Sequence, residues 1–170
     1  MHEDLIERHR RACAGFSNVA ADLSDEQWSR PTPCTEWDAR ALVEHLIGFH
    51  EVLLLRPLGV RAHRPKTGPA ARWEATSTAM FDALTEPLPV LGALTTDVLV
   101  HTWDLARAAG APVVLDAELV DRALDGLRAS DAELPADMFA AAVAVPDTAD
   151  PTTKLVARYG RDPRWTPPTG

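Results

Sequence analysis

The sequence predicts an all-α protein folded as a four-helix bundle, and three observations support this prediction. Apolar residues recur at helical spacing in four long segments. No stretch of useful length alternates apolar and polar residues as a strand does. Prolines and glycines bound the helical segments, and the connections are mostly short. Residues 1–170 are therefore expected to form one domain, long enough to bury about two thirds of the unfolded surface.

The first long helix is expected over residues 4–23, where apolar side chains keep a helical period. His9 and Cys13 fall on its apolar side, and we expect a half-buried histidine near a helix end and a small core cysteine. Residues 28–34 cannot continue as a helix because two prolines bracket a single residue there.

The second long helix is expected to begin with Thr35 as N-cap, since Asp38 three positions later completes a capping-box-like pair. It should run to about Leu55. His45 lies within its apolar stripe, whereas His50 falls outside the stripe and is expected to be exposed.

Two further long helices and two short C-terminal ones complete the prediction. Apolar and aromatic residues predict a third helix over 73–84, and a fourth over 91–109 is ended by Gly110. Residues 119–127 predict a short helix. A last short helix is expected within 150–160, with an aspartate as N-cap and a proline in the first position.

Three ionisable residues lie where a bundle core should be apolar. Asp97 and His101 are one turn apart inside the stripe of the fourth helix, and His45 lies inside that of the second. Each alone is compatible with a satisfied core histidine or a buried ion pair. Together they favour a divalent metal site with one coordination position left open for water or substrate.

Asp104, three residues after His101, leans toward the same side of the helix. We expect it to orient an imidazole, to transfer a proton beside the open position, or to lie exposed at the edge of the stripe. Trp37 and Trp103 fall on other helix faces and are interpreted as packing anchors.

Composition excludes several classes of function. Acidic residues outnumber basic ones by 25 to 17, and the net charge is −8, which argues against nucleic-acid binding. Cys13 and Cys34 indicate neither a disulfide framework nor a thiolate metal site. No apolar run is long enough to span a membrane, and the N-terminus does not resemble a signal peptide, so a cytoplasmic location is expected.

Four sequence motifs point to a known family. They are the Pro-Thr-Pro-Cys-Thr-Glu-Trp-Asp run of 31–38, Leu-Val-Glu-His at 42–45, the Asp-Val-Leu-Val-His-Thr-Trp-Asp run within 97–107, and the Tyr-Gly-Arg-Asp-Pro-Arg-Trp ending of 155–165. Over most of its length the chain resembles actinobacterial metal-binding proteins related to mycothiol-dependent maleylpyruvate isomerase. The resemblance implies a DinB/YfiT-like four-helix bundle with short additional C-terminal helices.

The resemblance also implies site residues. His45, Asp97 and His101 match the family's metal ligands, zinc being a frequent ion, and Asp104 matches an aspartate implicated in catalysis. The isomerase has Glu where this chain has the shorter Asp97, and a further domain of the isomerase supplies a catalytic arginine. Arg107 and Arg161 are the candidates for that arginine here.

The expected function is therefore that of a metal-dependent enzyme, with zinc as the expected ion. It would act on a small molecule, transferring a thiol to an electrophile or using the thiol to assist an isomerisation. By resemblance the thiol is mycothiol, and we expect no macromolecular partner beyond a second copy of the chain, if any. Two alternatives stay open: a hydrolase that uses metal-bound water, and a non-catalytic bundle that binds a metal or small ligand.

Overall fold

The computed structural model describes residues 4–61, 64–130, 134–135 and 138–168, and this part of the chain has helices and no strands, as the sequence predicts. The helices are α1 (Leu5–Ala21), α2 (Ala39–His50), α3 (Pro69–Ala83), α4 (Leu91–Ala109), α5 (Ala117–Ser130) and α6 (Pro151–Arg158), with a 3₁₀ turn at Gln27–Ser29 and a π-helical turn at Glu51–Leu55 that extends α2. No helix within the described ranges is both long and apolar enough to cross a membrane.

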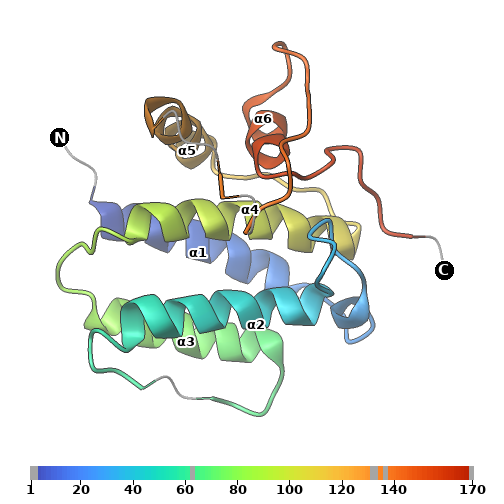
Figure 1. Ribbon diagram of the computed structural model, residues 1–170. Coiled ribbons are helices and arrows are strands. Elements are labelled where there is room, and N and C mark those ends of the chain that lie inside the picture. Colours follow the sequence, from blue (N-terminus) through green and yellow to red (C-terminus); the bar gives the residue numbers. More distant parts are fainter. Residues whose placement is uncertain (1–3, 62–63, 131–133, 136–137, 169–170) are drawn as a thin grey trace.

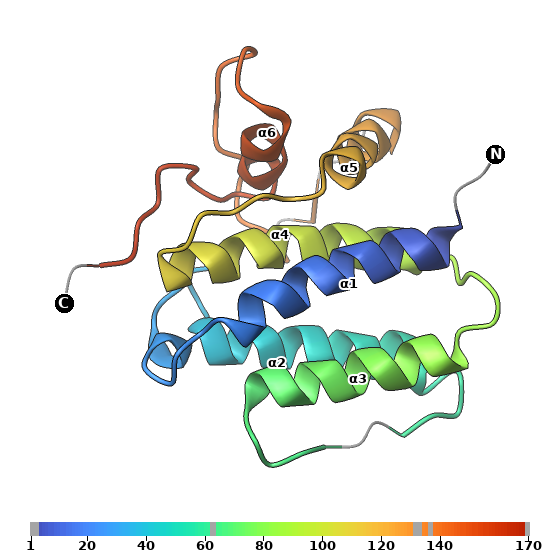
Figure 2. The same cartoon turned by 180° about the vertical axis from the view of Figure 1, so that it is seen from behind.

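The four long helices form a bundle of two pairs, α1 beside α4 and α2 beside α3 (Figure 1). Helices α5 and α6 lie on the outer side of the α1–α4 pair, away from α2 and α3 (Figures 1 and 2). Because α4 is covered from both sides, every residue from Val98 to Ala106 is buried. This explains why Trp103 is in the core, as predicted, although it lies outside the apolar stripe of α4.

Aromatic packing joins α1 to α3 at the centre of the bundle. The Phe16 and Trp73 rings are fully buried and meet edge to face, with centroids 4.9 Å apart. The indole N–H of Trp73 donates to the Ser17 hydroxyl at 3.1 Å, so its polar group is satisfied inside the core.

The start of α2 differs from the prediction. Asp38 is the N-cap, and its carboxylate accepts a hydrogen bond from the Ala41 amide at 2.8 Å. Thr35 cannot take that place because residues 34–37 form a turn, closed by the Trp37 amide donating to the Cys34 carbonyl at 2.9 Å. This turn leaves Cys34 and Trp37 beside the N-terminal half of α2.

The predicted exposure of His50 is wrong, because that side chain is fully buried. The apolar face of α2 is broader than a single stripe, since Val43 and Ile47 are buried as well as Leu42 and Leu46. His9 is likewise fully buried rather than half-buried. The two imidazole rings stack in the core with centroids 5.2 Å apart.

Burial of these histidines predicts that the protein loses stability in mild acid. Burial, together with the charge of His50, lowers the pKa of His9 from 6.5 to about 3. The unfolded chain therefore takes up a proton below pH 6.5 that folded His9 does not. As the pH decreases from 6.5 to about 5, the free energy of unfolding should fall, with a slope for His9 alone that approaches about 1.4 kcal/mol per pH unit.

Urea denaturation across this pH range, with chelator present, measures the effect. His9→Gln is the matched control, because glutamine does not titrate and the pH slope should decrease by the His9 contribution. An unchanged slope in His9→Gln would show that His9 is not held neutral in the folded state.

Candidate metal centre

Helices α2 and α4 bring the three predicted metal ligands together. One donor atom each of His45, Asp97 and His101 lies within 4.8 Å of the other two. The Asp97 carboxylate lies between the imidazoles, with Oδ1 3.4 Å from His101 Nε2 and Oδ2 3.9 Å from His45 Nε2. Asp97 and His101 converge because residues four apart share a helix face.

The 3.4 Å between His101 Nε2 and Asp97 Oδ1 is the spacing of two ligands on one metal ion, and the 3.9 Å between Asp97 Oδ2 and His45 Nε2 is too long for a hydrogen bond. A tetrahedral zinc ion about 2.0 to 2.2 Å from each donor separates the donors by about 3.2 to 3.6 Å. Among the described residues, Asp97 Oδ2 is buried and has no hydrogen-bond partner. A buried carboxylate oxygen without a partner costs stability, and a cation bound between the imidazoles would satisfy it. The two nitrogens and one carboxylate are also ligands that zinc accepts.

A buried ion pair between Asp104 and Arg161 contacts His101 on the side of the ring away from Asp97 Oδ1. His101 Nδ1 donates to Asp104 Oδ2 at 3.0 Å, which leaves Nε2 directed toward the candidate metal position. Arg161 in turn donates to the Asp104 carboxylate through Nε and through a terminal nitrogen, the latter at 2.8 Å. Gly160, which precedes Arg161, adopts a left-handed conformation with φ +79° and packs closely on Ala140, where a Cβ would lie only 2.7 Å away.

Of the three roles expected for Asp104, the exposed one is wrong, because the residue is fully buried. It is also not among the residues that line the cavity next to the candidate metal ligands. Its contacts favour orientation of His101 over proton transfer to a substrate. The pairing of Arg161 with Asp104 carries no sequence signal, since 57 residues separate the two.

The ionisable groups of the site shift one another's pKa values. Burial, and then the charge of His101, lowers the pKa of His45 to about 4. Burial would also lower the pKa of His101, but Asp97 and the hydrogen bond to Asp104 outweigh it and raise the pKa to about 9. The Asp97 pKa lies below its usual range despite burial, mainly because of His101. A metal ion must therefore displace the proton of His101.

A cavity of about 70 Å³ opens beside the three residues. The Trp37 ring stacks near His45, with centroids 4.2 Å apart, and lines the cavity with Phe49. The prediction that Trp37 lies on another face is therefore wrong, because the turn before α2 folds its ring back over the site, although the ring packs against the core as expected. Cys34 also lines the cavity, and burial raises its pKa to about 11, so it is a neutral thiol. Both cysteines are free.

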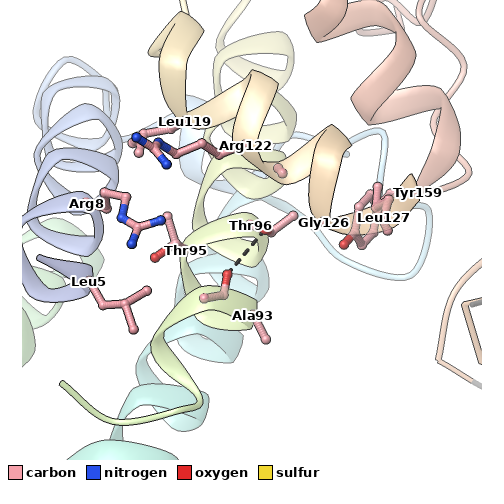
Figure 3. A pocket seen from close by; sticks show the side chains of 12 residues that line it. Leu5, Arg8, Ala93, Thr95, Thr96, Leu119, Arg122, Gly126, Leu127 and Tyr159 are labelled. Carbon is pink, nitrogen blue, oxygen red and sulfur yellow. Dashed lines mark hydrogen bonds between the residues drawn. The ribbon is translucent and has the colours of Figure 1, made fainter. Parts of the chain in front are cut away.

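A second hollow of about 330 Å³ adjoins this cavity and shares Cys34, Met138, Phe139 and Arg161 with it. A different hollow, of about 300 Å³, lies between α1, α4 and α5 (Figure 3). Thr96 and Arg122 line that hollow, and none of the candidate metal ligands does. We therefore take the cavity of about 70 Å³ as the candidate site, because His45, Asp97 and His101 line it.

Residues 9–106 match the family model described as the mycothiol maleylpyruvate isomerase N-terminal domain. The chain belongs to this family. The match covers α2, α3 and most of α1 and α4, and includes His45, Asp97, His101 and Asp104, whereas Arg161 lies outside it.

Relatives occur in mycobacteria. Two proteins described as uncharacterized, from two strains of Mycobacterium tuberculosis, are each 33% identical to the chain over 181 residues. The alignments cover 95% of this chain and the full length of each relative. No solved structure matches the chain.

Replacing either imidazole should remove the metal and leave the fold intact. His45→Ala and His101→Ala should each lose most of the zinc measured by elemental analysis after purification without chelator, because two remaining donors hold the ion weakly. The helical circular-dichroism signal should persist. Thr96→Ala, in the hollow of Figure 3, is the control and should keep its metal. Full metal content in either histidine variant would refute the ligand assignment.

Asp104→Asn separates orientation from direct ligation. An amide oxygen can still accept a hydrogen bond from His101 Nδ1. The zinc stoichiometry should therefore be retained at saturation, with the affinity for zinc reduced by about 10- to 100-fold. Arg161 loses its counter-charge, so the free energy of unfolding should fall by about 3 to 5 kcal/mol. Chelator competition and urea denaturation measure the two effects. Loss of stoichiometric zinc in a folded variant would instead make Asp104 a ligand.

Proposed function

We propose that this protein is a metal-dependent enzyme, with zinc as the metal, that uses a low-molecular-weight thiol as nucleophile. The thiol is transferred to a small electrophile or assists its isomerisation, and mycothiol is the thiol that the family suggests. The observation that supports this proposal most is the convergence of two imidazoles and one carboxylate beside a cavity. Three protein ligands leave a coordination position open, which is typical of catalytic zinc sites.

The residues of the site would have distinct roles. His45, Asp97 and His101 would hold the ion, which lowers the pKa of a bound thiol so that the sulfur is nucleophilic at neutral pH. Asp104 would fix the tautomer and the ring orientation of His101. Trp37 and Phe49, whose ring centroids lie 4.2 and 4.4 Å from that of His45, would limit access of water to it.

The two adjoining hollows indicate how a substrate would lie. A cavity of about 70 Å³ admits the sulfur end of a thiol but not a whole cofactor-sized molecule. The neighbouring hollow of about 330 Å³ has room for part of the remainder. Cys34 borders both and stays protonated at neutral pH, so it would not compete as a nucleophile.

Thiol consumption on a panel of small electrophiles tests the proposal. Turnover should require both the thiol and the metal, and mycothiol should be used in preference to glutathione. His45→Ala should abolish turnover along with the metal, whereas Thr96→Ala should match the wild type. Turnover without any thiol would indicate a hydrolase that uses metal-bound water. Stoichiometric metal with no turnover on the panel, and no binding of mycothiol, would indicate a non-catalytic bundle.

A further inference from the structure

A second cluster of potential metal ligands lies deeper in the bundle. His9 and Cys13, one turn apart on α1, meet His50 of α2, and all three side chains are buried. One donor atom from each lies within 4.8 Å of the others. None of the three lines the cavity beside His45, and the proposed function uses none of them.

Hydrogen bonds at the outer nitrogens fix how the two imidazoles face each other. His50 Nδ1 donates to the Leu46 carbonyl at 2.6 Å, so its Nε2 carries a lone pair. His9 Nδ1 lies 3.1 Å from the Thr95 hydroxyl, whose own proton is donated to the Leu91 carbonyl at 2.6 Å. The Thr95 oxygen therefore accepts from His9, and His9 Nε2 carries a lone pair as well.

The two Nε2 atoms lie 3.2 Å apart, so with these tautomers two acceptors oppose each other inside the core, and the Cys13 thiol, 3.6 Å from His9 Nε2, can donate a hydrogen bond to one of them. A proton between them would place a positive charge there, and burial lowers the pKa of both rings. The metal-free protein can relieve the opposition by turning the Thr95 hydroxyl away from Leu91 and moving the His9 proton to Nε2. A bound cation satisfies both lone pairs without that rearrangement.

Two of the three donor separations are close to those of a metal site. An ion about 2.0 Å from each nitrogen separates the nitrogens by about 3.3 to 3.5 Å, and a metal–sulfur bond of about 2.3 Å gives a nitrogen–sulfur distance of about 3.6 Å. The observed distances are 3.2 Å between the nitrogens and 3.6 Å from His9 Nε2 to Cys13 Sγ. We propose that His9, Cys13 and His50 form a second, buried site that binds Cu(I) through two imidazole nitrogens and one thiolate.

Charge and softness select Cu(I). Thiolate ligands favour soft ions, and one thiolate balances the charge of a monovalent ion, whereas Zn²⁺ would leave a net positive charge in the core. On binding, the Cys13 S–H bond breaks, a sulfur–copper bond forms, and the proton leaves to solvent. Copper and sulfur both keep their oxidation states.

Cu(I) binding is tested in a His45→Ala background, which disables the first site and makes the outcome independent of the proposed function. The chain is refolded from urea with Cu(I) under anaerobic conditions, so that burial does not limit access. It should then retain one equivalent of Cu(I) against bicinchoninate. Adding Cys13→Ser should abolish this retention, whereas adding Cys34→Ser, the matched control at the other free cysteine, should not.

X-ray absorption at the copper edge of the His45→Ala protein provides a measurement that needs no core substitution. It should show two nitrogen neighbours and one sulfur neighbour. The proposal is overturned if the His45→Ala protein retains no Cu(I), if folded Cys13→Ser retains it equally, or if sulfur is missing from the copper environment. Any of these results would leave the cluster as a hydrogen-bonded histidine pair beside a core thiol.

Discussion

The ion pair between Asp104 and Arg161 is the contact on which the candidate site depends. Both side chains are buried, and neither could remain charged there alone without a large cost in stability. The pair attaches the segment after α6 to the C-terminal half of α4, and its carboxylate also accepts a hydrogen bond from His101 Nδ1. The position of His101 is thus linked to contacts made by residues far along the chain, outside the part that matches the family model.

Helix α2 has a comparable role on the opposite side of the site. His45 and His50 lie on different faces of this helix, so it contributes one imidazole to the cluster with α4 and another to the cluster with α1. Burial keeps both rings neutral in mild acid, which preserves their lone pairs for ligands. A bundle with polar groups on two faces of one helix needs a partner for each group, and this requirement limits how far α2 can shift or rotate.

The sequence predicted the bundle and the three candidate ligands because both rest on local periodicity. An ionisable residue within an apolar stripe is visible without knowledge of its neighbours, as with His45, Asp97 and His101. Four features depended on tertiary contacts and escaped prediction. The turn at 34–37 moved the N-cap to Asp38 and placed Trp37 over the site, the broad apolar face of α2 buried His50, and Arg161 reached Asp104 across 57 residues. No spacing rule predicts contacts of this kind.

The binding of one metal ion by His45, Asp97 and His101 can be observed by crystallography. Diffraction from crystals of protein purified without chelator, recorded at the zinc absorption edge, locates the ion. We expect one anomalous peak between His45 Nε2, His101 Nε2 and the Asp97 carboxylate, about 2.0 to 2.2 Å from each. Zinc-replete crystals with no peak there, and with Asp97 hydrogen-bonded directly to both imidazoles, would contradict it.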